Sequence, residues 1–298
     1  MRLLQTTALM VSAVACLAAQ SKTPAFDSGR AYEHMRRFVG FGPRPAGSPA
    51  IAESRKYIFA ELEKIGLKAE EQRWEAQTPL GPRAMSNVMA RIKGTRPERI
   101  VFAGHYDTKF FREFPFVGAN DGGSSGAFLL ELARVLKDRQ NPFTMEFLWL
   151  DGEEATLTEW GETGKDNTYG SRQYVDEAKK AGALGSIKAL ILVDMIGDRQ
   201  LVIKRELNST KWLTDTIWAA AADLKVAQFS PAATNIDDDH VAFLKAGVDA
   251  VDIIDLDYPA WHTAQDTLDQ VSAGSLEAVG KVLLHALPNI EKRLSAGK

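Results

Sequence analysis

Apolar residues recur at helical and at strand spacing, in alternation, along most of the chain. Helical spacing extends from 26 to 39 and from 51 to 65, and a loop rich in glycine and proline separates these segments. Short apolar or alternating runs further on predict strands, and the segments between them predict helices. The expected strands are 67–74, 85–92, 99–103, 144–150, 189–194 and 250–254, and the later helices are 123–136, 169–181, 211–223, 241–246 and 272–294.

This alternation is typical of an α/β fold. We expect an α/β/α sandwich with a mixed, largely parallel central sheet that is covered by helices on both faces. No linker rich in proline and serine, no charge block and no internal repeat divides the pattern. The sequence therefore predicts one domain, from residue 24 to residue 298.

The first residues have the pattern of an export signal. Arg2 is followed by an apolar stretch with several small residues, which predicts a signal peptide over residues 1–19, too short to span a membrane as a mature helix. We therefore expect a protein without a membrane span, either periplasmic or secreted. Cys16 offers an alternative, because Ala13-Val14-Ala15-Cys16 resembles a lipoprotein cleavage box, whereas cleavage near Ala19 would remove the thiol.

The composition restricts which partners and which kinds of metal site are possible. The chain has 298 residues, of which 45% are hydrophobic and 25% charged, and a net charge of -3. This balance gives no basic field for nucleic acid, and we expect no nucleic-acid partner and a monomer. With a single cysteine, neither a disulfide framework nor a site with several thiolates can form. Any metal must be held by Asp, Glu and His.

The apolar run that ends at Leu150 is followed at once by Asp151-Gly152-Glu153-Glu154. Adjacent carboxylates that leave water repel one another unless a cation or a proton compensates them. A bound metal would compensate, with one glutamate as ligand and its neighbour as base. The alternative is an ordinary polar loop after a strand. Residues elsewhere in the chain must distinguish between a metal site and such a loop.

Further polar residues follow the other predicted strands. In such sheets, ligands gather at the carboxyl ends of the strands. The residues expected at this edge are His105 and Asp107, Asp121, Glu153 and Glu154, Asp194, and His262. A set of carboxylates and imidazoles without sulfur favours zinc with an open position for substrate. Glu153, next to a ligand, is the natural general base.

Other chemistries fit the sequence less well. The glycine-rich loop around Asp121 matches neither nucleotide-binding motif. Gly122 to Gly126 has the Gly-x-Ser-x-Gly spacing of a hydrolase elbow, but no strand leads directly into the serine. We interpret His34 and His285 as structural or solvated residues, since both lie within predicted helices, and His240 as intermediate, because the aspartates before it could cap a helix.

Several motifs occur together and in order, over nearly the whole mature chain. They are Gly104-His105-Tyr106-Asp107-Thr108-Lys109, Val117-Gly118-Ala119 leading to Asp121, Glu131-Leu132-Ala133-Arg134, Asp151-Gly152-Glu153-Glu154-Ala155, Tyr169-Gly170-Ser171-Arg172, Leu192-Val193-Asp194-Met195-Ile196-Gly197, Asp238-Asp239-His240 and Trp261-His262-Thr263. In these motifs the chain resembles the zinc-dependent aminopeptidase superfamily of the M28 type. Within it, the chain is most similar to the glutaminyl cyclases.

The resemblance implies a role for each matching residue. Asp121, Glu154 and His262 would hold one Zn²⁺, and Glu153 would transfer a proton. Asp194 and Asp239 would be the acidic hydrogen-bond partners of the site. Trp160, Trp261, Tyr258 and Lys109 would bind the substrate. That substrate would be a peptide or protein with an N-terminal glutamine, which is cyclised to pyroglutamate with release of ammonia.

An aminopeptidase with two zinc ions is the alternative within the same superfamily. His105 and Asp194 would then hold a second zinc, Asp121 would bridge, and Glu153 would activate water. Lys109 with the aromatic segment 110–116, the Asp238-Asp239-His240 box and Trp261 favour the cyclase. Two positions depart from that pattern, because Asp252 replaces a histidine and Tyr258 replaces a phenylalanine. A catalytically silent receptor-like ectodomain is disfavoured because every ligand position is filled.

Overall fold

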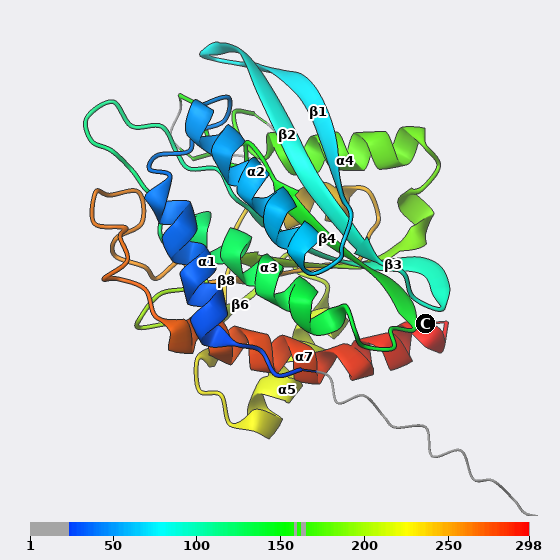
Figure 1. Ribbon diagram of the computed structural model, residues 1–298. Coiled ribbons are helices and arrows are strands. Elements are labelled where there is room, and N and C mark those ends of the chain that lie inside the picture. The colour runs from blue at the N-terminus through cyan, green and yellow to red at the C-terminus, as the bar shows by residue number, and fades with distance from the viewer. Residues whose placement is uncertain (1–23, 158–159, 162–164, 298) are drawn as a thin grey trace, which may run out of the picture.

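The computed structural model describes residues 24–157, 160–161 and 165–297, and shows a central sheet with helices on both faces (Figure 1). The expected signal peptide and Cys16 lie outside these residues. The helices are α1 Ser28–Gly40, α2 Pro49–Lys64, α3 Gly123–Leu136, α4 Tyr169–Lys180, α5 Lys211–Leu224, α6 His240–Lys245 and α7 Ala273–Ser295, with a 3-10 turn at Leu184–Ser186. The strands are β1 Ala69–Thr78, β2 Gly81–Ile92, β3 Arg96–His105, β4 Phe143–Leu150, β5 Ile187–Asp194, β6 Ile203–Glu206, β7 Phe229–Thr234 and β8 Ala250–Ile254.

Six strands form the central sheet, in the order β1-β2-β4-β3-β5-β8. The pairs β3–β4, β3–β5 and β5–β8 are parallel, whereas β1–β2 and β2–β4 are antiparallel. This confirms the mixed sheet that the sequence predicts. Because β4, β3, β5 and β8 are parallel neighbours, their carboxyl ends meet at one edge of the sheet.

Alternating side chains of the central strands supply two separate cores. In β3, Ile100 and Phe102 belong to the larger core, which includes residues of α1, α2, α3, α5 and α7, whereas Val101 and Ala103 belong to the core that includes residues of α4 and α6. This period of two is what a strand buried on both faces produces. The helices therefore cover both faces of the sheet, as expected.

The structure adds one feature that the pattern did not predict. Strands β6 and β7 pair in parallel as a separate two-stranded sheet. β6 has only four residues, and β7 contains Pro231, which lacks an amide for strand pairing, so neither has a clear strand signature. No helix in the described part of the chain is long and apolar enough to cross a bilayer.

Candidate active site

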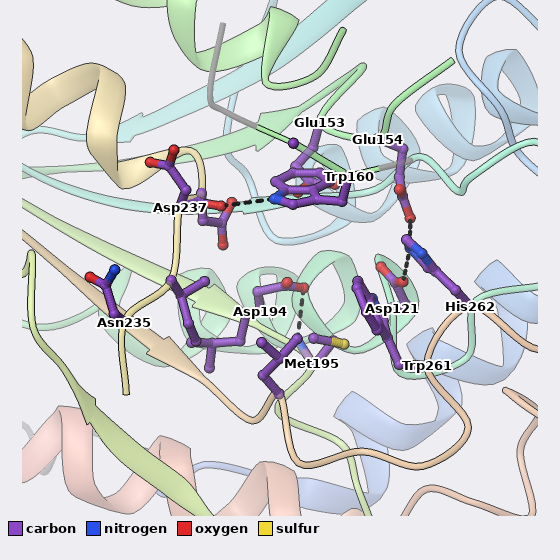
Figure 2. Close-up of a pocket in the computed structure, with 15 residues that line it drawn as sticks. Asp121, Glu153, Glu154, Trp160, Asp194, Met195, Asn235, Asp237, Trp261 and His262 are labelled. Carbon is purple, nitrogen blue, oxygen red and sulfur yellow. Dashed lines mark hydrogen bonds and ion pairs between the residues drawn. The ribbon is translucent and has the colours of Figure 1, made fainter. Parts of the chain in front are cut away.

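The predicted ligands gather at the carboxyl edge of the sheet. His105 is the last residue of β3 and Asp194 the last of β5, and Glu154 follows β4 by four positions. Asp121 lies in the loop just before α3, and His262 in the segment that follows β8. Residues that are far apart in the sequence are thus brought together by the parallel strand order (Figure 2).

These residues form two groups that could each hold a metal ion, and Asp121 belongs to both. In the first group, Nε2 of His262 lies 3.2 Å from Oε1 of Glu154 and 3.4 Å from Oδ2 of Asp121. In the second, Nε2 of His105 lies 3.0 Å from Oδ1 of Asp194 and 3.2 Å from Oδ1 of Asp121. Asp121 therefore presents one carboxylate oxygen to each histidine.

The first group fits a zinc ion in its chemistry and its burial. Among the residues that the structure describes, Oδ2 of Asp121 and Oε2 of Glu154 are buried atoms without a hydrogen-bond partner, a costly arrangement unless a cation binds there. Burial disfavours a charged His262, but Glu154 and Asp121 raise its pKa to about 10. The carboxylates thus create a strong negative field at this point. Two carboxylates and one imidazole form a ligand set that zinc accepts.

Asp107 fixes the segment that carries the two glutamates. Its carboxylate oxygens accept hydrogen bonds from the backbone amides of Glu153, at 3.2 Å, and of Glu154, at 3.3 Å. Gly152 has a φ of +71°, which allows the chain to turn sharply at the end of β4. Asp107, found after β3, therefore orients the catalytic candidates after β4.

Glu153 is buried beside the ligands but belongs to neither ligand group. Its Oε2 lies 3.6 Å from Nδ1 of His105, and its side chain lines the cavity at this edge of the sheet. Burial raises the pKa of Glu153 well above its ordinary value, and the carboxylates of Glu154, Asp238 and Asp194 raise it further against the opposing effect of His105. A group in this position can exchange a proton with a molecule in the cavity.

A cavity of about 340 Å³ opens over these residues. Trp160 and Trp261 are among its lining side chains, and Figure 2 shows them on opposite sides of the opening. The indole of Trp160 donates a hydrogen bond to the carbonyl oxygen of Asp237 at 3.2 Å, and the indole of Trp261 stacks on the His262 ring with centroids 4.2 Å apart. The remaining wall includes Met195, Ile236, Ile254 and Leu256.

Two predicted substrate-binding residues lie elsewhere in the described structure. Lys109 is buried behind the glutamates, where its Nζ donates to the carbonyl oxygen of Ala155. Tyr258 is also buried, and its hydroxyl donates to Asp266 at 2.7 Å. Neither lines the cavity beside Glu153. Phe111 and Phe116 of the aromatic segment pack edge-on against His262. This segment therefore supports the candidate metal ligand His262 rather than forming the cavity wall.

The structure distinguishes the two aspartates before α6. Asp238 lines the cavity together with Asp194 and Glu153. Asp239, which the resemblance implicated, lies behind the cavity wall and accepts a 2.5 Å hydrogen bond from the hydroxyl of Ser171. The resemblance assigned the role to Asp239, whereas the carboxylate that lines the cavity is that of the neighbouring Asp238.

His240 and Asp252 form a buried layer behind Asp238. Nε2 of His240 lies 3.1 Å from Oε2 of Glu206, and its Nδ1 lies 3.7 Å from Oδ2 of Asp252. Burial raises the pKa of Asp252 well above its ordinary value, and the neighbouring carboxylates, Asp238 first, add to the effect. Both carboxylate oxygens of Asp252 are buried without a hydrogen-bond partner among the described residues.

The remaining histidines lie away from the site. Nδ1 of His34 is 2.6 Å from the hydroxyl of Tyr57, between α1 and α2. His285 lies on α7 near Asp223. Neither belongs to a group that could hold a metal ion among the described residues, in agreement with the expectation that they are structural or solvated.

Comparison with known proteins finds relatives of this chain in both sequence and structure, and these agree with the fold. Residues 87–287 match the model of peptidase family M28. The glutaminyl-peptide cyclotransferase-like protein of Mus musculus is 31% identical over 271 residues, covering 80% of this chain and 70% of that protein. The crystal structure of Acidobacteriales bacterium glutaminyl cyclase has a TM-score of 0.87 and 36% identity, and the match covers 92% of this chain and 98% of that one. The structure of a leucine aminopeptidase precursor from Bacteroides thetaiotaomicron has a TM-score of 0.82 and 27% identity, over 90% and 99% of the two chains.

Fold and site together define an α/β sandwich enzyme with two groups of residues that could hold a metal ion at the carboxyl edge of its sheet. The chain belongs to peptidase family M28. Its similarity to glutaminyl cyclases in both sequence and structure confirms the resemblance that its motifs carry.

Proposed function

We propose that this protein is a zinc-dependent glutaminyl-peptide cyclotransferase, which converts the N-terminal glutamine of peptides or proteins to pyroglutamate and releases ammonia. The observation that carries the proposal is the position of Glu153, which lies in a cavity walled by Trp160 and Trp261, beside the ligand group of Asp121, Glu154 and His262. Similarity to relatives and structures named as glutaminyl cyclases supports it.

The reaction needs an amine, an amide and a residue that moves one proton. The α-amine of the glutamine attacks the carbon of its own γ-amide, so a ring C–N bond forms and the bond to the amide nitrogen breaks. Glu153 takes the proton that the amine loses and returns it to the departing nitrogen, which leaves as ammonia. Water is not a reactant. Since both reacting groups belong to one residue, the enzyme mainly supplies orientation and charge stabilisation.

Other side chains orient the substrate. Asp194 and Asp238 line the cavity and can accept hydrogen bonds from the amine and amide N–H groups of the substrate. Trp160 and Trp261 would pack against the glutamine side chain and exclude water from it. Asp121, Glu154 and His262 would hold the zinc, which when bound supplies polarisation of the γ-carbonyl.

An aminopeptidase remains a second candidate, because one specific observation favours it. His105, Asp121 and Asp194 form a further group with the geometry of a second metal site. With two ions, Glu153 would activate a water molecule for hydrolysis of the first peptide bond. The named similarity to a leucine aminopeptidase precursor gives this candidate some support.

One assay distinguishes the two candidates. Purified protein is offered a peptide that begins with glutamine and a matched peptide that begins with leucine. The cyclase releases ammonia from the first and leaves both chains at full length. Liberation of free leucine or free glutamine would contradict the proposal and favour the peptidase.

The setting of the enzyme is also part of the proposal. Residues 24–298 would act as one catalytic domain, monomeric, with residues 1–19 as an export signal. The product would then be periplasmic or secreted, or held by a lipid on Cys16. N-terminal sequencing of the mature protein tests this, since a chain that keeps residues 1–19 would contradict it.

A further inference from the structure

One buried residue, Asp266, accepts hydrogen bonds from the backbone amides of the loop that carries Asp121. The carboxylate of Asp266 accepts hydrogen bonds from the backbone amides of Asn120, at 2.8 Å, and of Asp121, at 3.1 Å. Its backbone carbonyl accepts a third, from the amide of Ala119 at 3.2 Å. Three successive backbone amides of this loop therefore donate hydrogen bonds to the same residue, Asp266.

Backbone carbonyl groups of the same loop face a buried arginine side chain. Arg44 is fully buried, and its guanidinium donates to the carbonyl oxygens of Val117, at 2.7 Å, and Gly118, at 3.1 Å. It also donates to carbonyl oxygens of Phe38, Gly42 and Tyr106. The loop thus lies between a positive and a negative side chain, each placed at the matching end of the peptide dipoles.

A tyrosine hydroxyl fixes Asp266 in turn. The hydroxyl of Tyr258 donates to Oδ1 of Asp266 at 2.7 Å. The ring of Tyr258 packs with Met195, Ile254 and Trp261, which line the cavity. A phenylalanine here could make the same ring contacts but not the hydrogen bond. The tyrosine therefore connects the cavity wall with the support of a metal ligand.

Asp266 also lies in the same short segment as His262. The amide of Thr263 donates to the carbonyl of Ala260 at 3.1 Å, and the amide of Asp266 donates to the carbonyl of Thr263 at 3.2 Å. His262 has a φ of +53°, a conformation that a non-glycine residue keeps only where its surroundings hold it. One compact turn thus supplies a ligand, His262, and the anchor for the backbone of another, Asp121.

We propose that Asp266, oriented by Tyr258 and opposed by Arg44, is a positioning residue that fixes the distance between Asp121 and His262. Asp121 is common to both ligand groups, so a shift of its backbone would disturb either metal arrangement. This inference rests on the metal site of the proposed function. It does not depend on whether the reaction is cyclisation or hydrolysis.

The test measures zinc affinity by competition with a chromophoric chelator, for the full mature chain and its variants. Tyr258→Phe and Asp266→Asn remove the hydroxyl and the charge from the anchor. Tyr174→Phe is the matched control, because the hydroxyl of Tyr174 also donates to a buried carboxylate, that of Glu146, at 2.8 Å, on the far side of the sheet. Thermal unfolding of the metal-free proteins, measured in parallel, reports the loss of stability alone.

Asp266→Asn is expected to weaken zinc binding by about 10- to 100-fold, the range seen when residues that support metal ligands are replaced. Tyr258→Phe, which acts through Asp266, should have a smaller effect of about 3- to 10-fold. Tyr174→Phe should lower the unfolding temperature and leave zinc affinity unchanged. Wild-type affinity in both Tyr258→Phe and Asp266→Asn would overturn the inference, as would an equal loss in Tyr174→Phe. If Asp266→Asn does not fold, Tyr258→Phe decides alone. A wild-type protein that binds no zinc would overturn the metal site itself.

Discussion

The imidazole of His105 hydrogen-bonds the carboxylate of Asp194, with Nε2 and Oδ1 3.0 Å apart. In an aminopeptidase, this pair would hold the second zinc. In the first group, by contrast, Oδ2 of Asp121 and Oε2 of Glu154 are buried without hydrogen-bond partners among the described residues. His105 of the second group also has a buried atom without a hydrogen-bond partner in the described structure, Nδ1, but its Nε2 and Oδ1 of Asp194 satisfy one another, so we propose that the zinc of the cyclase binds at the first group.

Metal content tests this assignment. Elemental analysis of the purified protein is expected to find about one zinc per chain. His262→Ala should lose it, because the replacement removes the imidazole of the first group. His105→Gln should keep it. A wild-type protein with about two zinc ions, one of which is lost in His105→Gln, would contradict the assignment and support a two-metal peptidase.

Replacing Glu153 by glutamine removes the proton carrier but keeps the shape of the side chain. The rate of ammonia release should fall by about 10²- to 10⁴-fold, as expected for loss of a general base, while zinc content stays normal. Glu75→Gln, at an exposed position of β1, is the control and should not change the rate. Retention of activity in Glu153→Gln would show that another group moves the proton.

The two aspartates before α6 give separable predictions. Asp238→Asn should lower kcat/KM about 10- to 100-fold with little loss of stability, because Asp238 lines the cavity and its charge would face the substrate. Asp239→Asn should instead cost about 1–3 kcal/mol of unfolding free energy, since it weakens the buried bond from Ser171. Ser171→Ala, the matched control, should resemble Asp239→Asn. The opposite pattern would support Asp239 as the catalytic partner.

Much of the fold could be predicted from the sequence because most of its elements have clear periodicity. The runs at 99–103 and 144–150 were expected as buried strands, and both are present with slightly wider bounds. The insertion of β4 between β2 and β3 could not be predicted, since it depends on long-range pairing rather than on local pattern. The short pair β6–β7 was missed for the opposite reason, that its local pattern is weak.

The candidate site, like the fold, could be predicted from the sequence only in part. Ligand-type residues at strand ends were identifiable, because a carboxylate or imidazole directly after an apolar run stands out. Asp266 was missed, since an aspartate four residues after His262 looks like an ordinary turn residue. Its role depends on hydrogen bonds to a distant loop. The amide of Asn120, for example, lies 146 residues away in the sequence. Lys109 and Tyr258 were expected in the cavity, but their burial behind it follows from packing that the sequence does not reveal.

The indole of Trp160 is expected to bind substrate rather than to stabilise the fold. Its Nε1 donates to the carbonyl of Asp237 at the cavity wall. Trp160→Phe should raise KM for a glutamine-initiated peptide by about 3- to 10-fold, since loss of that bond frees the ring that packs on the substrate. Trp212 lies on the remote helix α5 and donates an indole hydrogen bond to Asp249, so Trp212→Phe should leave KM unchanged. Equal KM values for wild type and Trp160→Phe would remove Trp160 from the binding site.

The central claim is that the attacking group is the substrate's own amine and not water. Mass spectrometry of a glutamine-initiated peptide, incubated with the enzyme in heavy-oxygen water, tests it most directly. The account predicts a product that has lost one ammonia, keeps every residue and contains no heavy oxygen. A peptide shortened by one residue, or a product that has gained heavy oxygen, would contradict it.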